Sequence, residues 1–240
     1  MGSALPQLPD SMLGLLARYD REAERTARVG MLLPWANQVV ETELPLLGLR
    51  HTVFHHARLV PASRTTAVDD SFWHGLREAA AGAMDSMRHL PLDLTLLACT
   101  SAGFSGGPPL PPGVVTAFDA LIETLRAGGA SRVVLATPYP QEVTDAEAAS
   151  LEEAGIQVTD QVCLGMTDGY PDVTSENIHA MFHRLSPCSV RAADAAVLSC
   201  TGWHTLRLLP ELEREFGIPV LSSNVAMALH AARPVIGATP

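Results

Sequence analysis

The chain has 240 residues, of which 47% are hydrophobic and 18% are charged, and its formal net charge is −10. This composition indicates a folded globular protein of one large or two small domains and excludes an intrinsically disordered chain. The acidic charge and the 16 scattered Lys and Arg residues exclude a nucleic-acid partner, because phosphate binding needs clustered basic side chains.

The start of the chain lacks the features of a signal peptide, which are a basic leader and an uninterrupted apolar segment. We therefore expect a cytoplasmic protein. No apolar run reaches the roughly 20 residues that a membrane span requires, so we expect no membrane partner. The stretch at 11–28 has helical spacing of apolar residues and predicts an added helix on the surface or at a subunit contact. The sequence leaves a homo-oligomer open.

From Val29 onward, short apolar runs alternate with amphipathic stretches. The runs predict strands that begin at residues 29, 51, 92, 132, 156, 195 and 218. The stretches between them predict helices at 71–90, 113–129, 141–156, 175–185 and 206–218. Such alternation predicts an α/β fold with parallel sheets that helices cover on both faces.

The two halves of this pattern resemble each other. An early strand with a polar turn recurs at 32–37 and 135–140, and a later strand that ends in Cys-Thr recurs at 99–100 and 200–201. We therefore predict two pseudo-symmetric lobes, each a parallel sheet flanked by helices, with the active site in the cleft between them. The predicted parts are a helical extension at 1–27, a first lobe at 28–127 completed by a C-terminal helix at 224–240, and a second lobe at 128–223.

The two Cys-Thr pairs place a thiol at the end of a strand in each half. Ligands gather at the carboxyl ends of parallel strands, and backbone N–H groups there favour the thiolate. A lone free cysteine usually packs in a core, and we assign that role to Cys163 and Cys188. Matching positions favour a shared function for Cys99 and Cys200 instead. Because the four cysteines form no C-x-x-C pair, we expect neither disulfides nor a zinc cluster.

Several segments of the sequence resemble one known superfamily. They are VGMLLPWANQVVETELP, ACTSAGF, LATPYPQEV, LSCTGWHTL and FGIPVLSSNVA. Together they resemble the aspartate/glutamate racemase superfamily, nearest to its branch of maleate cis-trans isomerases and arylmalonate decarboxylases. The resemblance extends from about Arg28 to the end of the chain. It implies two pseudo-symmetric lobes, no cofactor and a cleft between two cysteines.

The resemblance also implies roles for individual residues. Cys99 resembles the nucleophile of the first lobe, and Cys200 resembles the acid of the second. Asn37 matches an Asn that holds a substrate carboxylate, and Tyr139 matches a Tyr that donates to a carboxylate on the other side. For Asn37 a purely structural role stays open, because Asn is also a favoured residue at the start of a helix.

The strand ends carry further candidate donors. A carboxylate substrate in an acidic protein must meet oriented hydroxyl and N–H groups, and Thr100, Ser101, Thr201 and Gly202 offer them as substrate-binding residues. The sequence departs from the family at Gly169, where the relatives usually have a substrate-binding Asn.

Two other motifs receive structural interpretations. GFSGG fits the G-x-S-x-G pattern of serine hydrolases, but Ser105 does not directly follow a strand, so we expect a flexible loop over the cleft. His179 and His183 have helical i,i+4 spacing, and His55 and His56 are adjacent. Neither pair shows a third ligand nearby in the sequence, so we expect solvated histidines and no metal site.

These observations predict a cofactor-independent isomerase that acts on a small carboxylic acid substrate. In this hypothesis Cys99 adds to the double bond of an unsaturated dicarboxylate, and Cys200 supplies or removes a proton. An amino-acid or hydantoin racemase, or an arylmalonate-type decarboxylase, would use the same two cysteines. A catalytically silent carboxylate-binding protein is the alternative of another class.

Overall fold

The computed structural model describes residues 11–233, which form two four-stranded parallel sheets. The first has the order β2-β1-β3-β4 and contains β1 (Ala27–Pro34), β2 (Thr52–Leu59), β3 (Leu94–Leu97) and β4 (Val114–Thr116). The second has the order β6-β5-β7-β8 and contains β5 (Arg132–Thr137), β6 (Gln157–Cys163), β7 (Ala195–Leu198) and β8 (Val220–Ser222). The strand order is the same in both sheets, so the predicted α/β fold with two pseudo-symmetric lobes is confirmed.

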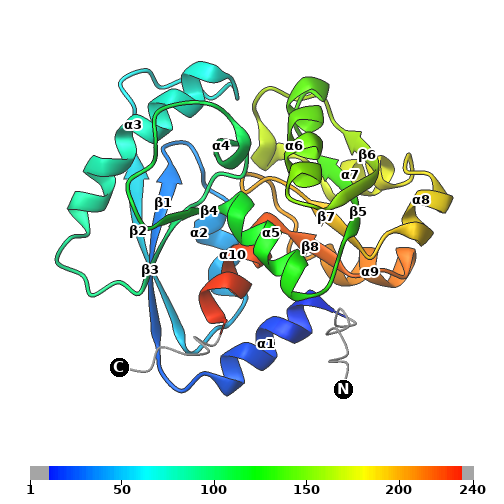
Figure 1. The fold of residues 1–240 in the computed structure, drawn as a ribbon, viewed down its shortest axis with the longest axis horizontal. Coiled ribbons are helices and arrows are strands. Elements are labelled where there is room, and N and C mark those ends of the chain that lie inside the picture. The colour runs from blue at the N-terminus through cyan, green and yellow to red at the C-terminus, as the bar shows by residue number, and fades with distance from the viewer. Residues whose placement is uncertain (1–10, 234–240) are drawn as a thin grey trace.

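The two lobes lie side by side, each with helices around its sheet (Figure 1). In the first lobe α3 (Asp70–Ser86) packs on β2 and β1, and in the second α6 (Gln141–Glu153) packs on β6. The other helices that follow strands are α2 (Val40–Leu46), α4 (Ser101–Phe104), α5 (Ala117–Ala127), the 3₁₀ helix η1 (Tyr170–Asp172), α7 (Ser175–Phe182), α8 (Pro187–Ala192) and α9 (Leu209–Phe216). Within residues 11–233, no helix has both the length and the apolar character to cross a bilayer.

Two helices near the chain ends meet beneath the first lobe. They are α1 (Met12–Glu22) and α10 (Ser223–Ala232), and α10 also packs against α5 and α2. Asp20 of α1 accepts hydrogen bonds from the backbone N–H groups of Arg50 and His51, which ties this helix to the start of β2. The predicted lobe boundaries stay predictions, and residues 1–10 and 234–240 lie outside the described residues.

The start of the segment at 113–129 differs from the helix that the sequence predicted. Val114 to Thr116 form strand β4, which pairs with β3, and α5 begins only at Ala117. The reason is local, because β-branched residues favour extended backbone. The Thr116 side chain then accepts a hydrogen bond from the backbone N–H of Asp119, and the Asp119 carboxylate accepts one from Thr116 N, which makes a capping box.

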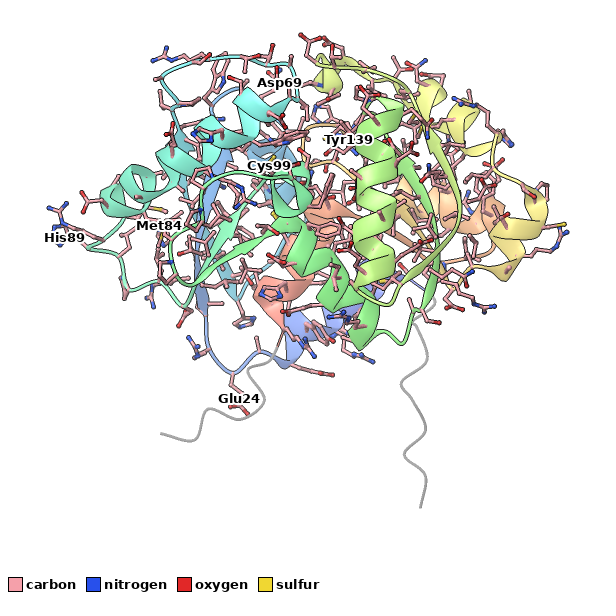
Figure 2. The ribbon with its side chains drawn as sticks, turned by 45° about the horizontal axis from the view of Figure 1, so that its top comes forward. Glu24, Asp69, Met84, His89, Cys99 and Tyr139 are labelled. Carbon is pink, nitrogen blue, oxygen red and sulfur yellow. The ribbon has the colours of Figure 1, made fainter. Side chains whose placement is uncertain are left out.

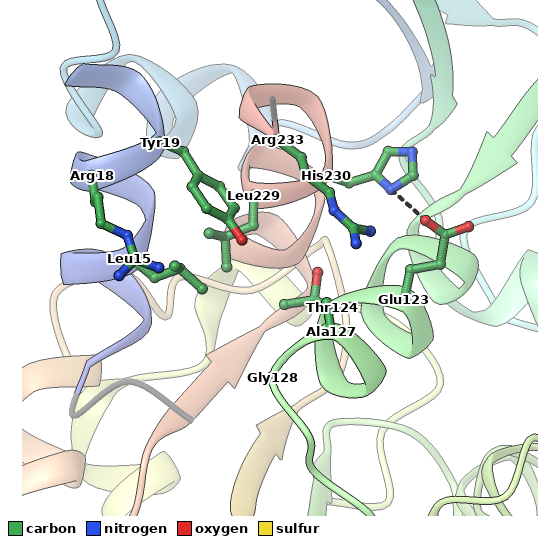
Figure 3. Close-up of a pocket in the computed structure, with 10 residues that line it drawn as sticks. All are labelled: Leu15, Arg18, Tyr19, Glu123, Thr124, Ala127, Gly128, Leu229, His230 and Arg233. Atoms are coloured by element: carbon green, nitrogen blue, oxygen red, sulfur yellow. Dashed lines mark ion pairs between the residues drawn. The ribbon is translucent and has the colours of Figure 1, made fainter. Parts of the chain in front are cut away.

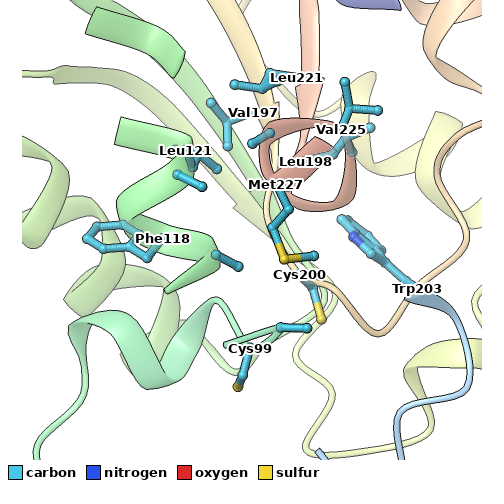
Figure 4. Close-up of a cluster of buried hydrophobic side chains, with 14 of the residues drawn as sticks. Cys99, Phe118, Leu121, Val197, Leu198, Cys200, Trp203, Leu221, Val225 and Met227 are labelled. Atoms are coloured by element: carbon cyan, nitrogen blue, oxygen red, sulfur yellow. The ribbon is translucent and has the colours of Figure 1, made fainter. Parts of the chain in front are cut away.

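One continuous cluster of buried apolar side chains runs through both lobes. Figure 4 shows the part of this cluster around Phe118, Met227 and Trp203, with Cys99 and Cys200 among the labelled side chains. The two lobes therefore share a core, and both thiols belong to it.

Candidate active site

A cavity of about 260 Å³ lies between the lobes. It is lined by segments that follow the carboxyl ends of β1, β2 and β3 in the first lobe and of β5, β6 and β7 in the second. Cys99 and Cys200 both line this cavity, as do Asn37 and Tyr139. Figure 2 shows Cys99 and Tyr139 near the line where the lobes meet. The parallel sheets thus bring residues that are far apart in the sequence to one cleft.

Cys99 follows the end of β3 and precedes the first turn of α4. Its Sγ lies 3.6 Å from the hydroxyl oxygen of Ser101, and it also accepts from the backbone N–H groups of Ser101 and Ala102. Burial raises the pKa of the Cys99 thiol, while these hydrogen bonds and the positive charge of Arg77 lower it. Burial dominates, so the net direction is opposite to the preference for the thiolate that the sequence suggested.

Arg77 holds its position beside Cys99 through backbone oxygens. Its guanidinium donates to the carbonyls of Ala102 at 2.6 Å, Ser105 at 3.1 Å and Pro108 at 3.1 Å. The cation therefore fixes both α4 and the loop that follows it. The carbonyls hold this cation without neutralising its charge.

Cys200 has a different environment at the end of β7. The backbone N–H of Gly202 donates to its Sγ at 3.2 Å, and the hydroxyl of Tyr139 also hydrogen-bonds to the thiol. Burial, together with smaller contributions from Cys99 and Glu147, raises the pKa of Cys200 to about 12 against the lowering effect of these bonds. Cys200 is therefore a protonated thiol at neutral pH.

Glu147 of α6 lies behind the Cys200 strand end. It is fully buried and is hydrogen-bonded to the hydroxyl of Ser199, the residue before Cys200. Burial raises the pKa of Glu147 to about 8, and the bond from Ser199 lowers it less. At neutral pH this carboxyl is therefore mostly uncharged, as an unpaired carboxyl in an apolar core must be.

Asn37 has the structural role at the start of a helix that the sequence left open, and it also lines the cavity. Its side-chain oxygen accepts from the backbone N–H groups of Val39 and Val40 at 3.0 and 3.1 Å, at the start of α2. Its amide nitrogen reaches across to the second lobe and donates to the backbone oxygen and the hydroxyl of Thr201, both at 3.2 Å. The side chain thus has a fixed orientation at the cavity wall.

Tyr139 is buried at the carboxyl end of β5. Its ring packs edge-on against the ring of Tyr170, with 5.6 Å between the centroids. The hydroxyl of Tyr170 donates to the backbone oxygens of Met166 and Thr167, at 3.3 and 3.1 Å. Tyr139 therefore directs its hydroxyl to Cys200 in the cavity, whereas the hydroxyl of Tyr170 is held by backbone.

Of the predicted hydroxyl and N–H donors, Ser101, Thr201 and Gly202 line the cavity, and Thr100 does not. Thr100 is fully buried and donates to the hydroxyl of Ser223 at 2.9 Å. Ser223 in turn accepts from the backbone N–H of Cys200 at 3.2 Å. Through Ser223, Thr100 therefore links the end of β3 to the end of β7 outside the cavity lining.

A buried carboxylate fixes the segment that follows Cys200. Glu43 of α2 accepts from the backbone N–H groups of Thr205 and Leu206, at 2.6 and 2.7 Å, and from the side-chain amide of Asn224 at 2.7 Å. A side chain of the first lobe thereby determines where this segment of the second lobe lies. Sequence reasoning gave Glu43 no role.

Sequence reasoning also missed the segment after β2 and, apart from Gly169, the segment after β6. Thr66, Val68 and Phe72 from the first, and Asp168 and Tyr170 from the second, line the cavity. The two segments touch, because the Thr66 hydroxyl donates to Asp168 at 3.3 Å and the backbone N–H of Val68 donates to the Thr167 carbonyl at 3.0 Å. Their position in the sequence could have indicated that they line the cavity, because both segments follow parallel strands of the same two sheets.

The serine of the GFSGG motif lies outside this cavity. Ser105 follows α4, and its hydroxyl donates to the carbonyl of Ser101 at 2.5 Å. The loop after it is held by Arg77 and contributes no residue to the cavity lining. Contrary to the expectation from the sequence, this loop does not cover the cleft.

The histidine pair on α7 has a third potential ligand, contrary to expectation. Glu215 of α9 lies beside His179 and His183, with ligand atoms of all three within 4.8 Å of one another. The sequence gave no sign of this, because the glutamate follows 32 residues after the second histidine on another helix.

A second cavity of about 170 Å³ lies between α1, α5 and α10 (Figure 3). Its charged residues are Arg18, Glu123, His230 and Arg233, and His230 faces Glu123 at 3.1 Å. No cysteine and no strand end contributes to it. It therefore lacks the reactive groups of the cavity between the lobes.

Comparisons with known proteins agree with this arrangement. The arylmalonate decarboxylase family profile matches residues 108–238. The maleate isomerase of Nocardia farcinica is 31% identical, over 86% of this chain and 89% of the relative. The arylmalonate decarboxylase of Bordetella bronchiseptica is 37% identical, over 49% of this chain and 50% of the relative.

One solved structure of a relative has a similar fold. It is a cysteine-to-serine mutant of Nocardia farcinica maleate cis-trans isomerase with a covalently bound succinylcysteine intermediate. It matches with a TM-score of 0.75 and 29% identity, over 85% of this chain and 90% of that chain.

Proposed function

The chain belongs to the maleate isomerase and arylmalonate decarboxylase branch of the aspartate/glutamate racemase superfamily, and we propose that it is a cofactor-independent cis-trans isomerase of maleate. The observation that carries the proposal is that two buried thiols, Cys99 and Cys200, line one cavity together with donors for carboxylates. The similarity to a maleate isomerase over most of the chain supports this substrate. The cytoplasmic location and a homo-oligomer stay predictions.

In the proposed reaction Cys99 first loses its proton to solvent and attacks one alkene carbon as a thiolate. A carbon–sulfur bond forms, and the π electrons move to the second alkene carbon, which takes the proton of Cys200. The product is a thioether of succinate, in which the former double bond is single and rotates. Cys200, now a thiolate, removes a proton from the second carbon, the double bond forms again, and the electrons of the carbon–sulfur bond return to Cys99.

The surroundings of the thiols support this division of roles. Ser101, two backbone N–H groups and Arg77 all stabilise negative charge on Cys99. Cys200, with a pKa of about 12, keeps its proton until a strongly basic carbanion forms beside it. These surroundings favour Cys99 as the nucleophile and leave Cys200 protonated, so that it can deliver a proton.

The substrate carries two carboxylates into a protein with a net charge of −10. We propose that the Asn37 amide and the backbone N–H of Thr201 donate to one carboxylate and Tyr139 to the other, because the Thr201 hydroxyl already donates to the Ala98 carbonyl at 2.8 Å. These groups already lie at the cavity wall with fixed orientations, so little reorganisation is needed when negative charge spreads into a carboxylate in the transition state.

The fixed positions of the two thiols determine which hydrogen leaves. If Cys200 removed the same hydrogen that it had delivered, the geometry of addition would simply be reversed and maleate would form again. The trans product requires rotation that brings the other hydrogen of the CH₂ group to Cys200. The delivered hydrogen therefore stays in the fumarate.

The test is proton NMR of the purified protein in D₂O with maleate, aspartate, glutamate and aryl malonates. We expect fumarate that carries one deuterium, with no deuterium in the remaining maleate. Fumarate without deuterium would show that Cys200 does not protonate the intermediate. Deuterium at the α-carbon of an amino acid would indicate a racemase instead, and the absence of any turnover would indicate a binding protein.

Decarboxylation is the second candidate, supported by the family profile and by the 37% identity to an arylmalonate decarboxylase over 49% of the chain. In that reaction a cysteine would protonate the carbanion left after loss of CO₂. Release of CO₂ from an aryl malonate, without isomerisation of maleate, would favour it over the isomerase.

A further inference from the structure

Two helices of the second lobe place histidine and glutamate side chains opposite each other. His179 lies in α7 and His183 at its C-terminal end, while Glu211 and Glu215 have the same four-residue spacing on α9. The backbone N–H of His183 donates to the carbonyl of His179 at 3.1 Å, so the helical turn between the two imidazoles is complete. None of the four residues lines the cavity of the two cysteines.

The distances within this cluster are short. Nε2 of His183 lies 3.0 Å from one carboxylate oxygen of Glu215, and Nδ1 of His179 lies 3.4 Å from the other. The second ring nitrogen of His179, Nε2, lies 3.6 Å from a carboxylate oxygen of Glu211. This nitrogen is buried and has no hydrogen-bond partner among the described residues.

Apolar packing holds the two helices in this position. The rings of Phe182 and Phe216 lie 5.3 Å apart, and the His183 ring lies 5.6 Å from the same Phe216 ring. Ile178 of α7 and Leu212 of α9 are completely buried. The side chains therefore project from rigid, packed elements, which is the arrangement that preorganised metal sites require.

We propose that His179, His183 and Glu215 form a binding site for one zinc ion. Imidazole nitrogen and carboxylate oxygen bind zinc at about 2.0–2.2 Å, which places tetrahedral ligand atoms roughly 3.3 Å apart. The distances of 3.0 and 3.4 Å join the two imidazoles to different oxygens of Glu215, and one ligand atom from each of the three residues lies within 4.8 Å of the others, so a rotation of the exposed Glu215 side chain brings them to this spacing. Zinc binds through His179 Nδ1, His183 Nε2 and a Glu215 oxygen, and solvent takes the fourth position.

Glu211 is the positioning residue of this site. A zinc-bound imidazole usually donates its other N–H to a carboxylate, which fixes the orientation of the ring. Nε2 of His179 faces Glu211 in this way, and a small movement of either side chain closes the 3.6 Å gap. This contact gives the buried, unpartnered nitrogen its function. The ion would join α7 to α9 at the surface of the second lobe.

The experiment measures zinc binding to the full chain after treatment with a chelator. Calorimetric titration with Zn²⁺ is expected to give one strong site per chain, and thermal unfolding is expected to shift upward with Zn²⁺. His183→Gln and Glu215→Gln should abolish this site, and Glu211→Gln should weaken it by about 10–100-fold. The matched control is His74→Gln, because His74 faces Glu78 at 3.2 Å on an exposed helical turn, with no third ligand among residues 11–233.

Cobalt(II) in place of zinc distinguishes this site from the four free cysteines. Ligation by nitrogen and oxygen gives visible bands without the sulfur-to-metal charge-transfer absorption of a thiolate complex. Unchanged zinc affinity in His183→Gln, or thiolate absorption at the first equivalent of cobalt, would overturn the proposal. Both outcomes are independent of the isomerase reaction, because binding and unfolding are measured without substrate.

Discussion

The ends of β3 and β7 occupy equivalent places in the two lobes, and each is followed by a cysteine, yet their surroundings differ. At Cys99 a helical turn begins at once and the cation of Arg77 lies nearby. At Cys200 the chain enters an irregular turn, and the carboxyl group of Glu147 lies behind the strand. The fold repeats the positions of the thiols, whereas a cation lies near only the first of them and a buried carboxyl group lies behind the second.

The difference teaches how one backbone pattern supports two chemical roles. Hydrogen-bond donors lower the pKa of both thiols, but Arg77 lowers only that of Cys99, and Glu147 raises that of Cys200, whose pKa is about 12. Since the thiol whose thiolate is better stabilised ionises first, a symmetric pair would have no preferred nucleophile. The asymmetry of the surroundings assigns that role to Cys99.

The largest expected effect comes from replacing each thiol. Cys99→Ser and Cys200→Ser should each slow isomerisation at least ~100-fold, because the nucleophile or the acid is lost. Only Cys200→Ser should retain an adduct of the substrate on Cys99, detected by intact-protein mass spectrometry. Cys163→Ser, outside the cavity, is the control. Near-native turnover in either variant would remove the assigned role.

The pH dependence of turnover tests the state of Cys99. Its pKa lies above the ordinary range and that of Cys200 is about 12, so both are thiols at neutral pH. Because the reactive form of Cys99 is the thiolate, kcat/KM should rise about tenfold per pH unit between about pH 6 and 8. Initial rates of fumarate formation give the profile, and a flat profile would mean that Cys99 is already ionised.

Tyr139→Phe tests the donor next to Cys200. Loss of a hydrogen bond to a charged group costs about 1.5–3 kcal/mol, so we expect kcat/KM to fall by about 10–150-fold. Tyr170→Phe is the matched control, because both rings line the cavity but the Tyr170 hydroxyl is bonded to backbone. Equal losses in the two variants would count against a specific role for Tyr139.

Glu147→Gln tests the carboxyl group behind the Cys200 strand. The pKa of Glu147 is about 8 in the folded protein and 4.5 as its ordinary value, so between these values the folded state binds more protons than the unfolded state. The contribution of Glu147 to the free energy of unfolding therefore falls as pH rises through this window. Denaturant unfolding should show the variant gaining at least ~1 kcal/mol over wild type between about pH 5 and 8. A pH-independent difference would contradict the raised pKa.

The smallest effect is expected at the position where the sequence departs from its relatives. Gly169 has a φ of 72°, which Asn tolerates better than most residues, and an added Cβ would meet only Met166 Cε at 3.8 Å. Gly169→Asn adds a donor to the cavity and should lower KM by about 2–10-fold. Gly165→Asn, with a φ of 74° outside the cavity, should leave KM unchanged.

The sequence predicted the repeated α/β lobes because apolar runs and their spacing depend on local chemistry. It also predicted that Cys99, Cys200, Asn37 and Tyr139 lie at strand ends around one cleft, because the carboxyl ends of parallel strands share one edge of a sheet. The net rise in the pKa of Cys99 was not predictable, because burial depends on packing between the lobes.

Long-range contacts account for the other omissions. Glu43 bonds to residues more than 160 positions away, and Glu215 meets His183 on a different helix. Neither pairing leaves a periodic pattern in the sequence. The short strand β4 was missed for a different reason. Its three residues directly precede an amphipathic helix, and the sequence pattern does not distinguish them from the first turn of that helix.

The carboxylate of Glu43 also bears on how a substrate enters. Two of its three bonds cross to the second lobe, so a hinge motion that separated the halves would leave this buried carboxylate with only Asn224 as a partner. The segments after β2 and β6 are joined by two hydrogen bonds, from the Thr66 hydroxyl to Asp168 at 3.3 Å and from the backbone N–H of Val68 to the Thr167 carbonyl at 3.0 Å. Asp168 is exposed, so parting these segments leaves no buried charge without a partner. We therefore expect maleate to enter by parting these segments, while the halves move as a single body.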